Sequence, residues 1–290
     1  MSSIVRFDPL QFREHFDRRP FMVEHDLCAH PLFGLPRLVR LARELPADRL
    51  EYNTGDVPVD LDPSATPGNG LSAEETVRRI EECNSWMVLK NVESDPEYAA
   101  LMLECLEAFT SHSEVLRPGT HLAEAFVFVS SPGSVTPFHI DPEHNFLLQV
   151  RGEKTIFVFD PADREIVSDV DLERFFSGAH RNLRFDERWQ GRASECRLAP
   201  GRGVHVPVAA PHWVKNGDGV SISFSVTFRS ARSKRIANIH QMNQRLRRCG
   251  MRPCPLGASA LRDRFKHGAN WVIRGASRLF RRVNGAPTGL

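Results

Sequence analysis

Two titratable side chains stand two positions apart in a stretch that otherwise has the apolar composition of β-strands. The stretch TPFHIDPEHNFLLQVRGEKTIFVF, residues 136–159, holds His139 and Asp141 among Phe, Ile, Leu and Val. Burying polar groups is unfavourable unless they are paired or bind a ligand. Residues i and i+2 of a strand point to one face, so we expect this imidazole and carboxylate on the same face. They are two of the three ligands of a 2-His-1-carboxylate metal site.

A third ligand is expected from a distant strand. His212 in VPVAAPHWVKN is the best candidate, because it opens a strand after a turn rich in Gly and Pro. His205 in RGVHVPV competes for this position, and His144 competes with His139 but lacks a carboxylate two residues later. Three protein ligands leave three positions on an octahedral ferrous ion for a bidentate co-substrate and dioxygen. An H-x-D pair alone also fits a surface His beside a turn Asp.

Further polar residues of the same stretch could bind a dicarboxylate. Lys154 begins a strongly apolar strand, and a Lys that enters a core needs an anion. Thr136 could add a hydroxyl to the same carboxylate, and Asn145 an amide near the metal. Each of these also fits an ordinary residue of a turn or strand end. The remaining polar residues are expected in turns and exposed to solvent: Glu143, His144, Arg151 and Glu153.

The combined pattern resembles a known family. TPFHIDPEHNFLLQVRGEKTIFVFDP, followed by PHWVKN and SISFSVTF, is similar to the JmjC (cupin-like) Fe(II)/2-oxoglutarate oxygenases, in particular the asparaginyl-hydroxylase-like (factor-inhibiting-HIF-like) branch. The resemblance covers roughly residues 75–229. It implies a double-stranded β-helix with helices at both ends. The positions that match the family motif are Thr136, His139, Asp141, Asn145, Gly152, Lys154 and His212.

The resemblance also implies an activity and its cofactors. His139, Asp141 and His212 would hold Fe(II), and Lys154 with Thr136 would fix the distal carboxylate of 2-oxoglutarate. The expected reaction uses dioxygen, converts 2-oxoglutarate to succinate and hydroxylates a protein side chain or a small molecule, with demethylation as an outcome where the hydroxylated carbon bears nitrogen. The protein would position the reactants and exclude water.

Two departures from that branch concern the co-substrate pocket. The branch has an Asn on the closing strand where this chain has Thr227. It also uses a Tyr for 2-oxoglutarate, but the two tyrosines here, Tyr52 and Tyr98, do not match that position. His121 and Ser225 are the alternatives that we consider for this role.

The order of the predicted elements indicates a mainly β fold with flanking helices, that is, a jelly-roll or cupin core. Short strands with turn signals follow one another from residue 121, which indicates a sandwich or barrel. We expect a helical and irregular region at 1–120, the core at 121–229 with a helical insertion near 161–190, and a helical region at 230–290. Within the first region, residues 1–70 read as irregular apart from a helix at LPRLVRLAREL, and SAEETVRRIEECN reads as a helix.

Charge is divided unevenly along the chain. Residues 229–290 contain 15 of the 38 Lys and Arg residues and one of the 36 Asp and Glu residues, so this tail carries about +14 and the body about −12. The tail includes a basic amphipathic helix whose apolar stripe is Leu261, Phe265, Val272, Ala276, Leu279 and Val283. Three partners remain open for it: a second copy of the chain in a homodimer, an anionic partner such as nucleic acid or a membrane surface, or the barrel itself.

Composition excludes some classes of protein. The sequence contains no apolar run of about 18 residues, so it predicts no transmembrane helix. The N-terminus lacks a secretory signal, and the six cysteines form no C-x-x-C pair, so a cytoplasmic location is expected. Two other functions compete with the oxygenase: a non-catalytic cupin-like ligand sensor whose basic tail binds nucleic acid or anionic membrane, and a cupin-type isomerase or dioxygenase. The latter usually carries H-x-H and does not need Lys154.

Overall fold

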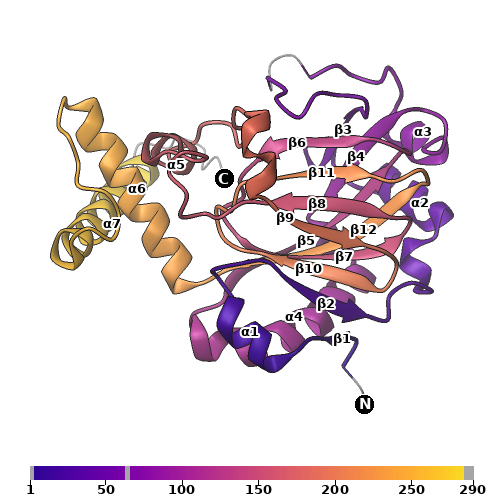
Figure 1. The fold of residues 1–290 in the computed structure, drawn as a ribbon, viewed down its shortest axis with the longest axis horizontal. Helices are drawn as coiled ribbons and strands as arrows, with labels where there is room; N and C mark the ends of the chain where they lie inside the picture. Colours follow the sequence, from indigo (N-terminus) through magenta and orange to yellow (C-terminus); the bar gives the residue numbers. More distant parts are fainter. Residues whose placement is uncertain (1–2, 63–65, 284–290) are drawn as a thin grey trace.

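Two β-sheets face each other and form the centre of the molecule (Figure 1). The computed structural model describes residues 3–62 and 66–283, with the side chains of 276–283 excepted. The larger sheet runs in the order β1 (Val5–Arg6), β2 (Phe21–His25), β10 (Arg202–Val206), β7 (His144–Arg151), β12 (Ser221–Arg229), β5 (His121–Ser130), β4 (Ser85–Lys90) and β3 (Leu50–Thr54). The smaller sheet runs in the order β6 (Val135–His139), β11 (His212–Asn216), β8 (Lys154–Val158) and β9 (Ser194–Leu198).

Helices cover the outer face of the larger sheet and extend the molecule at one end (Figure 1). The covering helices are α1 (Pro9–His15), α2 (Leu35–Glu44), α3 (Ala73–Arg78) and α4 (Pro96–Leu116). The extension consists of α5 (Asp169–Phe176), α6 (Ala231–Arg248) and α7 (Ala260–Val283). Helix α4 begins with Asp95 as N-cap, whose side chain accepts from the Glu97 N–H, and with Pro96 in the first turn. In the described part of the chain, no helix is both long and apolar enough to cross a membrane.

The central strands of the larger sheet are buried on both faces, and the two faces differ in chemistry. On β7, Phe146 and Leu148 face the helices, and Phe146 stacks on Phe109 of α4 with ring centroids 3.7 Å apart. The alternate residues of β7 face the other sheet, where Leu147 joins the apolar contacts between the sheets. Asn145 on that face is paired with a serine of β12. The inward face therefore keeps hydrogen-bonded polar groups beside the site described below.

The N-terminal region is more regular than the sequence indicates. Residues 1–70 were expected to be irregular apart from one helix, but β1, β2 and β3 extend both edges of the larger sheet. Strand β2 pairs with β10, from which it is far separated in sequence, so no hairpin signal accompanies it. The helix predicted over SAEETVRRIEECN is also shorter in the structure than in the prediction: α3 ends at Arg78. The predicted boundary at residue 121, between the N-terminal region and the core, therefore falls within one continuous sheet.

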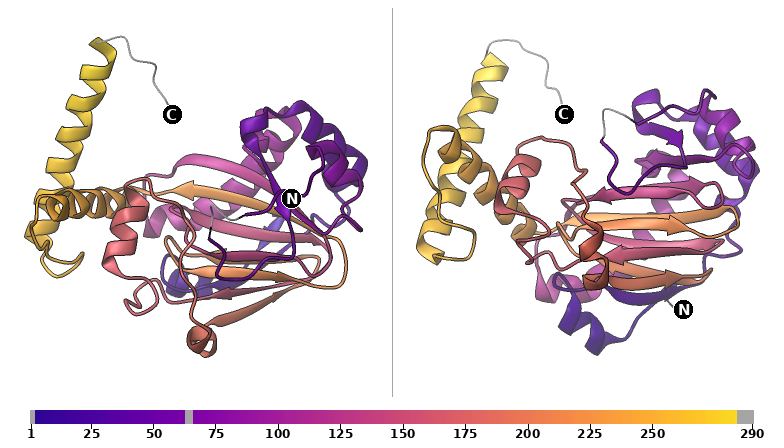
Figure 2. Two further views of the ribbon diagram at one scale, coloured as in Figure 1. Left: turned by 90° about the horizontal axis from the view of Figure 1, so that it is seen from above. Right: turned by 45° about the horizontal axis from the view of Figure 1, so that its top comes forward.

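The C-terminal helices stand apart from the barrel. Helix α6 packs on α5 and ends at Arg248, and Gly250, with a φ of 78°, follows its end. Helix α7 packs on α6 and projects away from the sheets (Figure 2). An ordinary amphipathic helix buries its apolar face, whereas the residues that α7 buries are polar: Asp263, Lys266 and Asn270.

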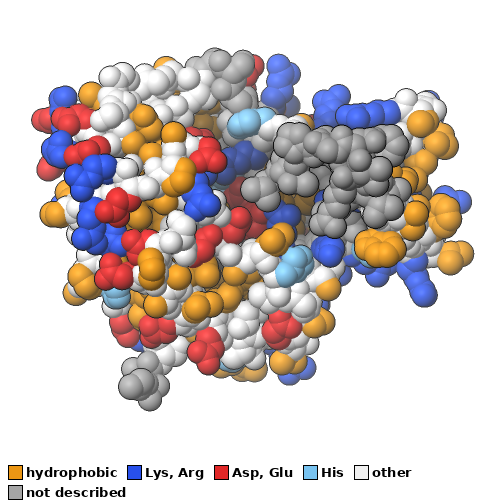
Figure 3. Space-filling view, turned by 180° about the vertical axis from the view of Figure 1, so that it is seen from behind, with side chains coloured by type: hydrophobic (Ala, Val, Ile, Leu, Met, Phe, Trp, Pro, Cys, Tyr) orange, Lys and Arg blue, Asp and Glu red, His pale blue; other side chains and the backbone are white. Residues whose placement is uncertain are grey.

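The predicted apolar stripe of α7 is exposed over its described part. Leu261, Phe265 and Val272 are 79%, 73% and 59% exposed. The side chains of Ala276, Leu279 and Val283 lie outside the described residues. Of the three partners left open for this stripe, the barrel is therefore excluded for the described residues. In Figure 3, the side chains drawn in colour at the C-terminal end of the molecule are mainly apolar and basic, whereas acidic and basic side chains are interspersed over the part that contains the sheets.

Candidate active site

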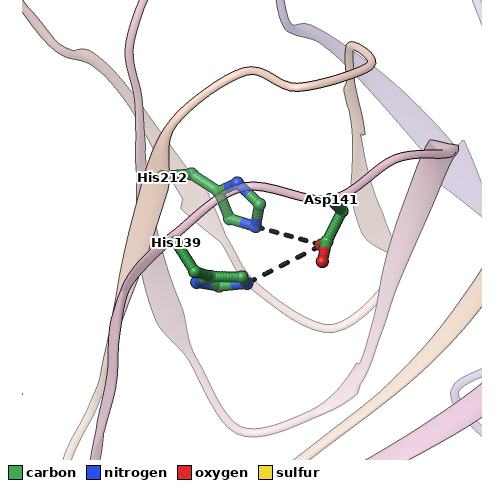
Figure 4. Close-up of side chains that lie close together, drawn as sticks. All are labelled: His139, Asp141 and His212. Atoms are coloured by element: carbon green, nitrogen blue, oxygen red, sulfur yellow. Dashed lines mark ion pairs between the residues drawn. The ribbon is translucent and has the colours of Figure 1, made fainter. Parts of the chain in front are cut away.

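Strands β6 and β11 bring His139 and His212 side by side. The two strands pair antiparallel with these residues as partners, and the imidazole centroids are 4.1 Å apart. The Asp141 carboxylate lies in front of both rings, with its Oδ2 atom 3.7 Å from Nε2 of His139 and 3.6 Å from Nε2 of His212 (Figure 4). One ligand atom from each residue lies within 4.8 Å of the others. The geometry could hold one metal ion.

Asp141 was expected on the same strand as His139, but it lies outside that strand. Strand β6 ends at His139, and Asp141 precedes Pro142, which disfavours regular continuation of the chain. The Asp141 carbonyl instead accepts a hydrogen bond of 2.8 Å from the N–H of Ala209. The prediction that His139 and Asp141 share one face of a strand was therefore wrong. The Asp141 carboxylate nevertheless lies close to both imidazole rings.

Backbone carbonyls fix the tautomers of both histidines. Nδ1 of His139 lies 2.7 Å from the Pro137 carbonyl, and Nδ1 of His212 lies 2.9 Å from the Ala210 carbonyl. Since a carbonyl only accepts, each Nδ1 donates its proton and each Nε2 keeps a free lone pair. Burial, with the neighbouring His212, lowers the pKa of His139 to about 3, and burial also lowers the pKa of His212. Both rings are therefore neutral near pH 7, as metal binding requires.

Asp141 is held in its ionised form. Burial alone would raise its pKa, but the neighbouring His139, Arg181 and His212 outweigh burial, so the pKa of Asp141 is lowered. Two neutral imidazole nitrogens and one carboxylate oxygen form a donor set that suits Fe(II) with open coordination positions. The residues present therefore fit the metal that the sequence implies.

Lys154 lies in the same cavity as these three residues. It is the first residue of β8, is 6% exposed, and lines the cavity together with His139, Asp141 and His212. In the part of the chain that the structure describes, no group pairs with its ammonium. Burial lowers the pKa of Lys154 to about 7. A buried and unpaired amine beside a candidate metal site is well placed to receive a carboxylate.

Thr136 and Asn145 line this cavity as well. Thr136 lies on β6, and Asn145 opens the inward face of β7. Oδ1 of Asn145 accepts a hydrogen bond of 2.7 Å from the Ser225 hydroxyl on β12. This bond leaves the amide N–H groups of Asn145 for the cavity. Ser225 therefore orients Asn145 and does not itself line the cavity.

The rival histidines lie elsewhere in the core. His205 stacks on Phe16, and its Nδ1 contacts the Asn145 carbonyl at 3.2 Å. His144 is fully buried in the same aromatic cluster, and its Nε2 is 3.3 Å from the Ser230 hydroxyl. The expectation that His144 is solvated was wrong. Glu143, which was also expected to be solvated, has a side chain only 13% exposed and pairs with Arg229 at 2.5 Å.

The other residues considered for the co-substrate do not line the cavity. His121 begins β5, and its Nδ1 bonds to the Gly119 carbonyl at 2.8 Å. The Thr227 hydroxyl lies 3.4 Å from the Glu124 carbonyl. Tyr98 donates its hydroxyl to the Leu32 carbonyl, under the helices that cover the larger sheet. Tyr52 lies on the edge strand β3.

Several residues that line the cavity were not predicted from the sequence, and three of them differ in kind from the aliphatic wall. Trp86 of β4 and Phe128 of β5 form apolar wall, and Arg181 comes from the insertion between β8 and β9. Trp86 and Arg181 also line an adjoining cavity with Glu51, Asn182 and others. None of these residues carries a local motif, because each is placed by the pairing of distant segments. The insertion was expected to be helical, but only α5 and a 3₁₀ helix at Glu187–Arg192 are helical in it.

Comparisons with known proteins place these features in a family context. A family model described as a cupin-like domain matches residues 47–234. Lysine-specific demethylase 8 of Xenopus tropicalis is 31% identical over 102 residues, which are 33% of this chain and 22% of that protein. JmjC domain-containing protein D of Dictyostelium discoideum is 32% identical over 138 residues, which are 45% of this chain and 29% of that protein. The chain therefore matches less than a third of the length of either relative.

A solved structure supports the fold. An X-ray structure of E. coli ycfD has a TM-score of 0.53 and 16% identity, over 94% of this chain and 68% of that chain. At this level of identity the similarity concerns the fold alone. Together with the family match, it confirms the predicted fold class of a cupin-like, mainly β core with flanking helices.

Proposed function

Since the chain belongs to the cupin-like domain family, matched over residues 47–234, we propose that it is an Fe(II)- and 2-oxoglutarate-dependent oxygenase. The proposal includes hydroxylation of a protein side chain or a small molecule. The observation that supports it best is one cavity that joins two neutral histidines and the Asp141 carboxylate to the buried, unpaired Lys154. A metal-binding cupin of another class has no need of that lysine.

The roles of the residues follow from their chemistry. His139, Asp141 and His212 would hold the metal, which when bound would couple the oxidative decarboxylation of 2-oxoglutarate to oxidation of a C–H bond. Lys154 would receive the distal carboxylate of 2-oxoglutarate, with the Thr136 hydroxyl beside it. The amide of Asn145, oriented by Ser225, would donate toward the metal end of the co-substrate. Trp86 and Phe128 would exclude water from the cavity.

The first test uses the full chain with Fe(II) and 2-oxoglutarate. Under anaerobic conditions we expect the weak visible charge-transfer band of a 2-oxoglutarate chelate, and after admission of air we expect succinate to form. Incubation with cell extract should then yield a product that has gained one oxygen atom. Absence of the band in the wild-type protein would reject the proposed function, and a band without succinate in air would favour the ligand sensor.

For the C-terminal helices we propose that the partner is a second copy of the chain. Phe265 and Val272 on the exposed stripe of α7 alternate with Gly268 and Gly275, around whose Cα positions the space is open. A glycine inside a helix costs about 1 kcal/mol relative to alanine, and close approach of another helix gives a reason to keep it. On such a stripe, the large side chains of one helix can pack against the glycine positions of a second, identical helix.

Sedimentation tests this interface. We expect the wild-type chain to sediment as a dimer and the double variant Phe265→Asp/Val272→Asp as a monomer, because a carboxylate cannot be buried unpaired. Leu103→Asp, an exposed position on α4, is the matched control and should remain dimeric. A monomeric wild type that binds anionic vesicles or nucleic acid through α7 would overturn the dimer and assign the stripe to an anionic partner.

A further inference from the structure

The insertion between β8 and β9 returns to the candidate metal site. The Leu183 N–H donates to the Phe138 carbonyl at 2.9 Å, and the Ile140 N–H donates to the Arg181 carbonyl at 3.2 Å. His139 and Asn182 form an isolated antiparallel bridge between these two bonds. Residues 181–183 therefore pair with the part of the chain that carries His139 and leads to Asp141. The backbone position of Arg181 is fixed by this pairing.

The two oxygens of Asp141 face different partners. Oδ2 faces the Nε2 atoms of the two histidines, whereas Oδ1 lies 3.6 Å from Nη1 of Arg181. The side chains of Asp141 and Arg181 are 20% and 34% exposed, so solvent screens this contact only in part. Oδ2 of Asp141 is thus the candidate metal ligand, whereas Oδ1 lies near the Arg181 guanidinium.

Arg181 is itself held from its other side. Its Nη2 atom lies 3.9 Å from Oε1 of Glu51 on β3, and Oε2 of Glu51 bonds to the Lys90 ammonium on β4 at 2.5 Å. Cations and carboxylates therefore alternate from Lys90 through Glu51 and Arg181 to Asp141. Two strands of the larger sheet fix the guanidinium, which would otherwise swing toward solvent.

We propose that Arg181 is a positioning residue that keeps Asp141 a one-oxygen metal ligand; this inference rests on the metal site of the proposed function. A carboxylate can bind a metal through one oxygen or through both. Binding through both would occupy a position that the keto-acid end of 2-oxoglutarate or dioxygen needs. By holding Oδ1, Arg181 keeps that position open, and Glu51 keeps Arg181 in place.

Cobalt(II) provides a readout that does not depend on turnover, because its visible spectrum reports the number and arrangement of ligands. We expect Arg181→Met to bind Co(II) but to give a different visible spectrum from the wild type before any 2-oxoglutarate is added. The affinity of the Co(II)-loaded variant for 2-oxoglutarate should fall by about 10-fold or more, in the range typical of lost partners of metal ligands. Arg181→Lys should lie between the two, and Glu51→Gln should shift the spectrum in the same direction.

Arg184→Met is the matched control, because Arg184 is an exposed arginine of the same segment. It should reproduce the wild-type spectrum and affinity. The spectrum also separates positioning from direct contact, since Arg181 lines the cavity. A fall in 2-oxoglutarate affinity with an unchanged Co(II) spectrum would overturn the proposal. If Arg181→Met fails to fold, an unchanged spectrum in Arg181→Lys and Glu51→Gln would overturn it. Failure of the wild type to bind Co(II) would instead reject the metal site itself.

Discussion

His139→Ala is expected to abolish the charge-transfer band of the Fe(II) and 2-oxoglutarate complex and to lower succinate formation at least about 1000-fold. The loss corresponds to ~4 kcal/mol, within the several kcal/mol that a catalytic metal contributes. His139 offers a lone pair on Nε2 because its Nδ1 proton is committed to the Pro137 carbonyl. Alanine removes one of only three protein ligands, so the metal is held by Asp141 and His212 alone. Absorption spectra recorded anaerobically and succinate measured in air check both expectations.

Two other histidines make this experiment specific. His121→Ala changes a residue outside the cavity and should leave the band intact. His205→Phe tests the rival third ligand, and phenylalanine suits a site among Phe16, Phe21 and Phe146. Persistence of the band in His139→Ala, or its loss in a folded His205→Phe protein, would show that the three-residue assignment is wrong.

The local sequence predicts the candidate ligands better than it predicts their surroundings. His139 and His212 can be predicted as ligands because each belongs to a short local sequence pattern at the end of a strand. The pairing of β6 with β11 then makes them partners in the sheet. The conformation at Asp141 was not predicted, because it depends on Pro142 and on the bond from Ala209. A carboxylate two residues from a histidine can meet it from a strand or from a turn, and the sequence does not distinguish these cases.

Residues placed by tertiary pairing were beyond the reach of local patterns. Arg181 reaches Asp141 only because residues 181–183 pair with the end of β6. Strands β2 and β3 were missed for the same kind of reason, since each is only five residues long and β2 pairs far along the chain. Helix α7 shows a different limit. Its periodicity correctly indicated an amphipathic helix, but periodicity does not say which face a neighbouring helix covers.

Lys154→Met is expected to raise the 2-oxoglutarate concentration for half saturation by about 30- to 1000-fold while metal binding survives. Loss of one partner from a buried, charge-assisted pair costs about 2–4 kcal/mol, which gives this range. Methionine keeps the length of the stem and removes the ammonium. Titration of the Co(II)-loaded protein with 2-oxoglutarate measures the change. Lys215→Met, on the neighbouring strand β11, changes an exposed lysine and should bind 2-oxoglutarate as the wild type does.

The lowered pKa of Lys154 gives this prediction a second, independent readout. Without a ligand its pKa is about 7, so the amine is largely neutral above pH 7, whereas a bound carboxylate favours the ammonium and raises the pKa. Binding above pH 7 must therefore take up a proton, and affinity should fall by up to tenfold per pH unit. Calorimetry in buffers of different ionisation enthalpy would detect this proton. In Lys154→Met the uptake should vanish. If Lys154→Met instead binds 2-oxoglutarate with wild-type affinity, Lys154 is not the anchor, and Arg181, the other cation among the described residues that line the cavity, is the group to test next.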